Sequence, residues 1–215
     1  MKAKLRSPYV SIALPDGDST GGSQMWSDRF AVKRCGCGAV AAYDLVLYLE
    51  NRDGLTFAYP GSRQEYCREL DKIQKKYFPV LYPNGINGLT LAVGLNRMLH
   101  DRHLPYHAFW GVSGKKIFHR IAGMLEIDIP VILAIGPNFP YVWHKNKLKL
   151  YQKNGAGKFV RTATVKGHYV TVLELEEDWI RISSWGRSYY VRLSEFSAYV
   201  NFHSNYLISN IICVR

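Results

Sequence analysis

The chain has 215 residues, of which 47% are hydrophobic and 13% aromatic, and its formal net charge at pH 7 is +11. This length and composition exclude a largely disordered chain and predict a globular protein with one sizeable core. The positive charge favours acidic partners such as nucleic acid, an anionic membrane surface or acidic peptides, without selecting among them.

The cysteine content and the hydrophobic runs bear on where the protein works. No continuous apolar run of the secretory-signal type precedes Pro15, and no segment approaches the roughly 18 apolar residues that span a membrane. The four cysteines, Cys35, Cys37, Cys67 and Cys213, are too few and too scattered for a disulfide scaffold. We therefore expect a cytoplasmic protein without a membrane span.

Helices dominate the predicted first half of the chain. Residues 1–33 are rich in Gly, Ser, Asp and Pro and predict an extended segment, so we expect a single domain over residues 34–215. A helical apolar period from Ala39 to Arg52 predicts a first helix that Gly54 ends. The same criteria predict further helices over residues 62–77, over residues 87–100, and from just after residue 113 to residue 125.

After Pro130 the pattern becomes that of strands. A buried apolar run is bounded by proline and glycine, and alternating segments follow, with a turn at Glu176-Glu177-Asp178. The predicted strands cover residues 129–136, 168–175, 179–185, 188–193 and 206–214. Helices first and antiparallel strands second predict an α+β fold.

Two cysteines alternate with two glycines, Gly36 and Gly38, directly before the first predicted helix. Cys35 and Cys37 are compatible with a metal-binding site, with a redox-active cysteine pair, or with one nucleophilic cysteine beside a structural one. A helix start stabilises a thiolate through unpaired N–H groups and the positive end of the dipole, and Cys37 is closer to it than Cys35. Gly38 would let a substrate carbonyl approach the sulfur. The alternative is a tight loop in which the cysteines are small buried side chains.

A thiol nucleophile needs a base, and His168 follows Gly167 at the start of a predicted strand. The next strand ends in Ser183-Ser184-Trp185-Gly186, where Ser183 would accept a hydrogen bond from the imidazole and orient it. Taken singly, either residue would be an ordinary strand position.

Metal and redox sites fit the sequence less well. His100, His103 and His107 have near-helical spacing, but Pro105 interrupts it and no H-E-x-x-H occurs. The cysteines are spaced C-x-C, whereas zinc sites and thioredoxin-like sites use C-x-x-C. We therefore predict neither a metal nor a cofactor.

A basic segment precedes His168. No acidic residue lies between Asp128 and Glu174, and lysines interleave with Trp143, Tyr151 and Phe159. Such interleaving is compatible with single-stranded nucleic acid binding. We favour a solvated hairpin with its tip at residues 154–157, acting as a substrate-facing flap.

Taken in chain order, the segments that contain Cys37, His168 and Ser183 resemble those of the papain-like cysteine peptidases, especially the bacterial C39-like branch. Cys-Gly-x-x-Ala opens the long helix, Gly-His-Tyr-Val starts a strand, and Ser-Ser-Trp-Gly is similar to the papain segment Asn-Ser-Trp-Gly. His168 follows Cys37 by 131 residues, within the roughly 130–150 residues of papain-type enzymes. The resemblance covers residues 35–193. Cys35 also satisfies Cys-Gly-x-x-Ala, and the helix position favours Cys37.

The resemblance implies a papain-like fold and a cysteine peptidase, or a related thiol amidohydrolase or acyltransferase, acting on a peptide or amide. Its catalytic residues would be Cys37, His168 and Ser183, with the Cys37 amide and Gln24 as oxyanion donors. The substrate would contact Gly36, Gly38, Gly167 and Trp185, and the basic flap would suit an acidic substrate. In the family the third catalytic residue is Asn or Asp, and Ala31 occupies the usual position of the oxyanion glutamine. The alternative is a catalytically degraded binding protein with a basic surface for nucleic acid or an acidic partner.

Overall fold

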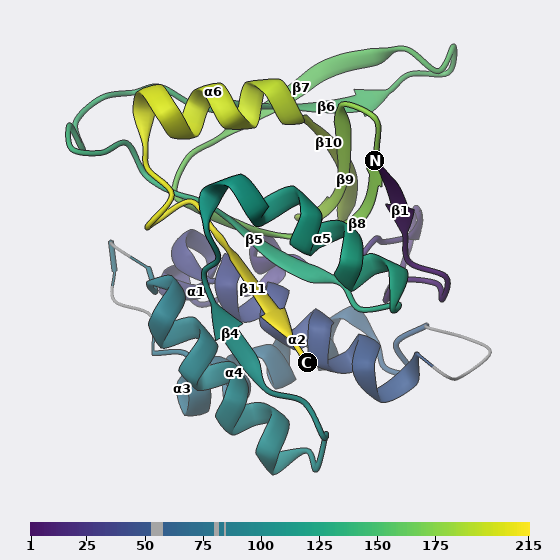
Figure 1. The fold of residues 1–215 in the computed structure, drawn as a ribbon. Coiled ribbons are helices and arrows are strands. Elements are labelled where there is room, and N and C mark those ends of the chain that lie inside the picture. Colours follow the sequence, from purple (N-terminus) through teal and green to yellow (C-terminus); the bar gives the residue numbers. More distant parts are fainter. Residues whose placement is uncertain (53–57, 80–81, 84) are drawn as a thin grey trace.

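Helices of the N-terminal half pack on an antiparallel sheet built mainly from the C-terminal half (Figure 1). The structure is a computed structural model and describes residues 1–52, 58–79, 82–83 and 85–215. The predicted α+β class is confirmed. Among the helices of these residues, none combines the length and the hydrophobicity that a membrane crossing requires.

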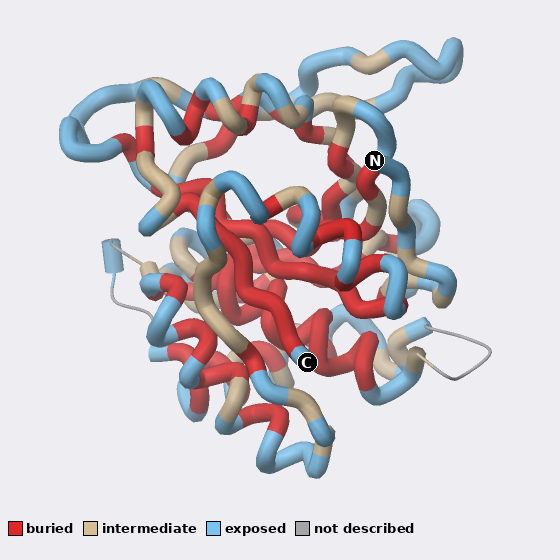
Figure 2. Tube along the Cα trace, in the orientation of Figure 1, coloured by how far each residue is buried: buried red, intermediate tan, exposed pale blue. Residues whose placement is uncertain are grey.

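The helix α2 is the centre of the helical layer. Its residues from Cys37 to Leu49 are all buried, and it packs on the sheet and on two other helices (Figure 2). The helices are α1 (Phe30–Cys35), α2 (Cys37–Asn51), α3 (Arg63–Tyr77), α4 (Gly88–Asp101), α5 (Ile117–Glu126) and α6 (Leu193–His203), with short 3-10 helices η1 (Gln24–Trp26) and η2 (Gly114–Lys116).

The predicted helix starts follow from capping. Ser62 accepts a hydrogen bond from the Glu65 backbone, and the Glu65 carboxylate accepts one from the Ser62 backbone, which completes a capping box. Asn87 caps α4 through its side-chain oxygen alone, which accepts a hydrogen bond from the Thr90 amide. Gly54, the predicted end of the first helix, lies outside the described residues. The helix α6 is not among the predicted elements, although its buried residues Phe196, Tyr199 and Val200 have helical spacing.

Nine strands of the described residues form one antiparallel sheet in the order β4-β11-β5-β8-β9-β10-β6-β7, with β1 pairing with β8. The strands are β1 (Lys2–Lys4), β4 (Ala108–Trp110), β5 (Val131–Ile135), β6 (Leu148–Lys153), β7 (Phe159–Val165), β8 (His168–Glu176), β9 (Trp179–Ser184), β10 (Arg187–Arg192) and β11 (Ile211–Val214). A separate pair joins β2 (Ala13–Leu14) to β3 (Gly17–Asp18). The last predicted strand is shorter than expected, because a turn occupies its first residues.

Residues 1–33 are part of the packed structure, which corrects the expectation of a merely extended segment. β1 pairs with β8, Ile12 is fully buried, and α1 begins at Phe30. The Thr20 amide donates to the Gly186 carbonyl, and this hydrogen bond ties the segment to the turn after β9. The following residues therefore lie beside the end of the sheet where β9 ends.

The basic segment forms the predicted hairpin, but the hairpin is not a flap over His168. β6 and β7 lie at the edge of the sheet, and β9 and β10 separate them from β8. The reason is the crossover after β5, which carries the chain past β8, β9 and β10 before β6 begins (Figure 1). The ring of Phe159 on β7 stacks on Trp179 of β9 with centroids 3.9 Å apart, so an aromatic contact holds the hairpin to the neighbouring part of the sheet.

Candidate active site

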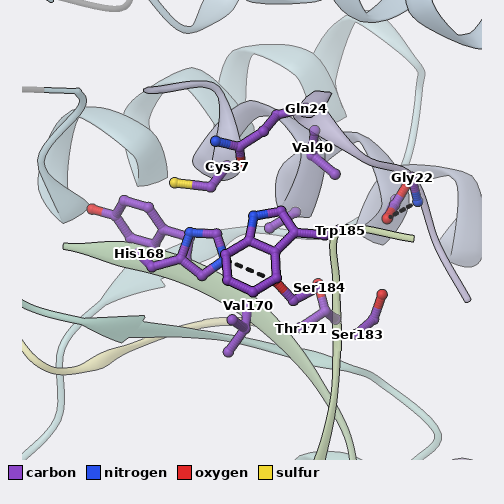
Figure 3. Close-up of a pocket in the computed structure, with 13 residues that line it drawn as sticks. Gly22, Gln24, Cys37, Val40, His168, Val170, Thr171, Ser183, Ser184 and Trp185 are labelled. Atoms are coloured by element: carbon purple, nitrogen blue, oxygen red, sulfur yellow. Dashed lines mark hydrogen bonds between the residues drawn. The ribbon is translucent and has the colours of Figure 1, made fainter. Parts of the chain in front are cut away.

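Five of the residues singled out from the sequence line one cavity between α2 and the sheet, namely Gln24, Cys37, His168, Ser183 and Trp185 (Figure 3). Cys37 is the first residue of α2, His168 is the first residue of β8, and Gln24 belongs to η1. Because β8 and β9 are antiparallel, the start of β8 and the end of β9 lie at the same end of the sheet. Segments far apart in the chain therefore contribute to one site.

Gly36 fixes Cys37 in the first turn of its helix. It is the C-cap of α1 and the N-cap of α2, so one residue separates the two helices. A Cβ atom at this position would lie 2.5 Å from the Val32 carbonyl oxygen, which excludes other residue types without a backbone shift. The prediction that Cys37, and not Cys35, starts the helix is confirmed; Cys35 ends α1, and its thiol lies 3.5 Å from the Pro83 carbonyl oxygen.

The imidazole of His168 is held on two sides. Its Nε2 lies 2.7 Å from Ser184 Oγ, and the Trp185 ring stacks on it with centroids 4.7 Å apart and planes 28° apart. Nε2 is thereby engaged, and in Figure 3 the other ring nitrogen lies on the side of Cys37. Nδ1 is therefore the ring nitrogen on the side of the thiol.

Ser184, not Ser183, is the serine on the histidine, which corrects the sequence prediction. Ser183 pairs directly with Thr171, so these two side chains share one face of the sheet. His168 lies three residues before Thr171 and, by alternation, on the opposite face together with Ser184. The Ser183 hydroxyl donates instead to the Thr20 carbonyl at 2.7 Å. Alternation combined with the strand register would have identified Ser184, but the register is not readable from the sequence.

Gln24 reaches the cavity although it precedes Cys37 by many residues. Its side chain is buried, and Nε2 donates to the Lys33 carbonyl at 3.2 Å. Figure 3 draws its amide nitrogen on the side of Cys37. A primary amide carries two N–H donors, so the hydrogen bond to Lys33 leaves one for a ligand. The turn through η1 and α1 brings Gln24 back to the start of α2.

Burial decides the protonation of the two central groups. Burial raises the pKa of the Cys37 thiol to about 11, and the backbone N–H groups of Tyr169 and Gly38 oppose this only in part. Burial lowers the pKa of His168 to about 4. Both shifts favour a neutral thiol beside a neutral imidazole at pH 7. The thiolate expected from the helix start is therefore not the resting form, because loss of hydration outweighs the helix dipole.

The predicted substrate-contacting residues divide into two groups. Trp185 lines the cavity and has φ 51°, an unusual conformation for a bulky residue. Gly36, Gly38 and Gly167 do not line it, and their contact with a substrate stays a prediction. Gly36 serves the helix junction, Gly38 packs against buried side chains of other elements, and Gly167 has φ 59° in the turn before β8.

A buried carboxyl behind Cys37 was missed by the sequence reasoning. Asp44 lies on α2, accepts hydrogen bonds from Tyr66 Oη at 2.7 Å and the Gly22 amide at 2.8 Å, and lines the same cavity. Burial raises its pKa from 3.8 to about 7. The signal in the sequence is a single acidic residue within an otherwise apolar helical run, since a buried carboxyl is costly without partners.

No protein-family model, curated protein or solved structure matches the chain. In the part of the chain that the structure describes, no group of three or more His, Cys, Asp or Glu side chains is arranged to hold a metal ion. His107 instead faces Asn96, with 3.4 Å between the imidazole Nε2 and the amide nitrogen. The chemistry available at the cavity is that of a thiol, an imidazole, a carboxyl group, several hydroxyls and amide donors.

Proposed function

We propose that the chain is a papain-like thiol hydrolase that cleaves a peptide or amide bond through Cys37. The observation that carries the proposal is the convergence of Cys37, His168 and Gln24 on one cavity, with Ser184 on the far nitrogen of the imidazole. A nucleophile, a base, an orienting group and an amide donor are the four parts that acyl transfer through a thiol requires.

The reaction begins with attack of Cys37 Sγ on the substrate carbonyl carbon. As the S–C bond forms, the thiol proton passes to Nδ1 of His168, and the carbonyl π electrons move to the oxygen. The intermediate collapses, the C–N bond breaks, and the leaving amine takes the proton from His168. A water molecule, deprotonated by His168, then hydrolyses the thioester, which releases the carboxylic acid and restores the thiol.

Charge on the tetrahedral oxygen requires donors that are already in position. The free N–H of the Gln24 amide and the backbone N–H of Cys37 are the proposed donors. Gln24 is anchored through the Lys33 carbonyl, so its orientation does not have to be established during the reaction. Removal of one such donor typically lowers kcat by about 100- to 1,000-fold.

The neutral resting pair determines the order of events. Because Cys37 is a thiol and His168 a neutral imidazole at pH 7, proton transfer accompanies the attack instead of preceding it. Ser184 supports this step, since a hydrogen bond at Nε2 fixes the ring while Nδ1 gains the proton.

Access to the thiol is restricted. Cys37 is 9% exposed and the cavity measures about 10 Å³, which is room for about one water molecule. A peptide therefore reaches Cys37 only when covering side chains such as Trp185 move, as in enzymes with gated sites. Small amides and flexible chain ends are the substrates that require the least movement.

The test uses the purified full chain and a set of fluorescent peptidyl acyloxymethyl ketones, which alkylate catalytic thiols after binding as substrates. We expect labelling at Cys37 that is lost in Cys37→Ala and His168→Ala and reduced in Gln24→Ala. Cys35→Ala is the matched control, because this thiol is two residues away and outside the cavity. Peptides cleaved from a mixed library, identified by mass spectrometry, then define the substrate.

Labelling that survives His168→Ala, or that falls mainly on Cys35, would contradict the assignment. Absence of both labelling and cleavage in the wild-type chain would leave a protein that binds without catalysis. In that case retention of oligonucleotides with a steep salt dependence would favour the nucleic-acid alternative.

A further inference from the structure

A patch of large apolar side chains lies at one end of the molecule, outside the candidate active site. Trp143 is 69% exposed and Val142 61% exposed, although both are hydrophobic. The patch consists of Phe139, Tyr141, Val142, Trp143, Phe202 and Leu207. Isolated exposed apolar residues are normal on a protein surface, but a contiguous group marks a binding surface.

Two segments that are distant in the sequence build the patch. One is the loop between β5 and β6, and the other is the end of α6 with the turn after it (Figure 1). The Phe139 amide donates to the His203 carbonyl at 3.0 Å, and Ser204 Oγ donates to the Pro137 carbonyl at 2.9 Å. These hydrogen bonds hold both segments side by side. In Figure 2 the loop is exposed over most of its length, whereas the segment at the end of α6 is mostly half-buried and exposes Phe202 and Leu207.

The loop is an ordered structure. The rings of Tyr141 and Trp143 pack with centroids 5.5 Å apart, and the His144 amide donates to the Tyr141 carbonyl at 2.9 Å. Lys166 Nζ donates to the His144 carbonyl at 2.6 Å and ties the loop to the segment before His168. The side chains of Tyr141 and Trp143 are therefore exposed to solvent on a turn that hydrogen bonds hold in place.

The segments that build the patch carry positive charge and no acidic residue. Residues 111–125, 129–173 and 196–215, which form and flank the patch, contain no Asp or Glu. The neighbouring lysines are Lys115, Lys116, Lys145, Lys147 and Lys166, with the first two next to the Tyr206 ring through Gly114. Among the ion pairs found in the described residues, none involves these five side chains.

We propose that this patch docks the protein on an anionic lipid surface. Trp and Tyr favour the boundary between headgroups and acyl chains, exposed aliphatic side chains insert below it, and lysines attract the anionic headgroups. A protein partner fits less well, because lysine is depleted in protein interfaces. Single-stranded nucleic acid fits less well, because Val142 and Leu207 offer no surface on which a base stacks.

The docking surface adjoins the candidate site. The loop leaves the sheet at Gly136, whose carbonyl accepts a hydrogen bond from the Gly167 amide at 3.2 Å, and Ile135 pairs with His168. A chain bound through the patch holds this end of the sheet near the lipid. The docking itself does not depend on catalysis by Cys37.

Co-sedimentation of the full chain with vesicles tests the docking. The two vesicle preparations are phosphatidylcholine alone and an equal mixture of phosphatidylcholine and phosphatidylglycerol. We expect partition to the anionic vesicles, loss of at least about tenfold in the double variant Val142→Ala, Trp143→Ala, and a loss of about thirtyfold in Lys145→Gln, Lys147→Gln. A blue shift of tryptophan fluorescence on the vesicles, absent in Trp143→Phe, would place this ring in the interface.

The matched control is Leu89→Ala, Val93→Ala, which removes two exposed apolar side chains from α4, away from the patch. This variant should bind vesicles as the wild type does. Equal weakening in the control, or no preference of the wild type for anionic vesicles, would overturn the proposal. Oligonucleotide binding or self-association that depends on Trp143 in the absence of vesicle binding would also overturn it. Loss of thiol labelling in Cys37→Ala leaves vesicle binding unchanged, so the two proposals fail separately.

Discussion

Asp44 makes the stability of this protein depend on pH. Its carboxyl is 1% exposed, and its two hydrogen bonds come from a tyrosine hydroxyl and a backbone amide, neither of which is charged. Burial therefore favours the neutral acid and raises the pKa from 3.8 to about 7. The perturbation is Asp44→Asn, which replaces the acid by a neutral group of the same shape.

The sign of the effect follows from proton binding. Between about pH 4 and pH 7 the folded chain holds a proton on Asp44 that the unfolded chain has released, so stability falls as pH rises through this range. The folded and unfolded pKa values of Asp44 differ by about 3, and a difference of one in pKa corresponds to about 1.4 kcal/mol of unfolding free energy. The free energy of unfolding should fall by about 4 kcal/mol, and above about pH 7 the contribution stays constant.

Urea unfolding monitored by tryptophan fluorescence measures this difference. His168 contributes the opposite dependence, because its lowered pKa makes stability rise with pH, but both proteins retain it. The difference in unfolding free energy between wild type and Asp44→Asn isolates the carboxyl. We expect the free energy of unfolding of Asp44→Asn to increase relative to that of the wild type as pH rises from about 4 to 7. A difference that stays constant over this range would refute the reasoning.

Three further predictions concern the site and its packing. Ser184→Ala removes the hydrogen bond to His168 and should lower kcat/KM about 5- to 150-fold, because a buried unpaired group costs about 1–3 kcal/mol. Alkylation of Cys37 by iodoacetamide, followed by peptide mass spectrometry, should still accelerate above pH 9, because burial raises the pKa of this thiol to about 11. Gly22→Ala should lower the free energy of unfolding, measured by urea denaturation, by about 1–3 kcal/mol, because its Cβ would overlap the Tyr66 hydroxyl.

Each of these predictions has a control within the chain. Ser183→Ala removes a hydrogen bond to Thr20 and should leave kcat/KM close to that of the wild type. Denatured protein supplies the reference for alkylation, since its thiols titrate near about 8.5. Gly123→Ala lies on α5 with open space around its Cβ and should raise stability by about 1 kcal/mol. A larger rate loss in Ser183→Ala than in Ser184→Ala would reverse the assignment of the orienting serine.

Local chemistry accounts for what the sequence predicted well. Ser62 and Asn87 start helices because their side chains satisfy free N–H groups, and this depends only on neighbours in the chain. The alternating segments became β8, β9 and β10 with only small changes at the ends. Cys37 starts a helix for a different local reason, since Gly36 carries no capping side chain and instead permits the sharp junction between α1 and α2.

Long-range placement accounts for what the sequence did not reveal. The crossover after β5 puts the basic hairpin at the edge of the sheet, which no local pattern encodes. Residues 1–33 looked extended from composition, yet they bring Gln24 to the cavity through contacts with the turn after β9. Both errors arise because strand order and chain return depend on the whole core.

The sequence by itself determined the α+β class, the positions of most helices and strands, and the residue types from which a thiol site is built. Only the tertiary structure decided that Ser184 and not Ser183 reaches His168, because strand register sets which side chains share a face. Only the tertiary structure decided that Cys37 and His168 rest in their neutral forms. Burial by distant segments removes the water that would stabilise either charge, and hydration is a property of the folded surroundings, not of the residue.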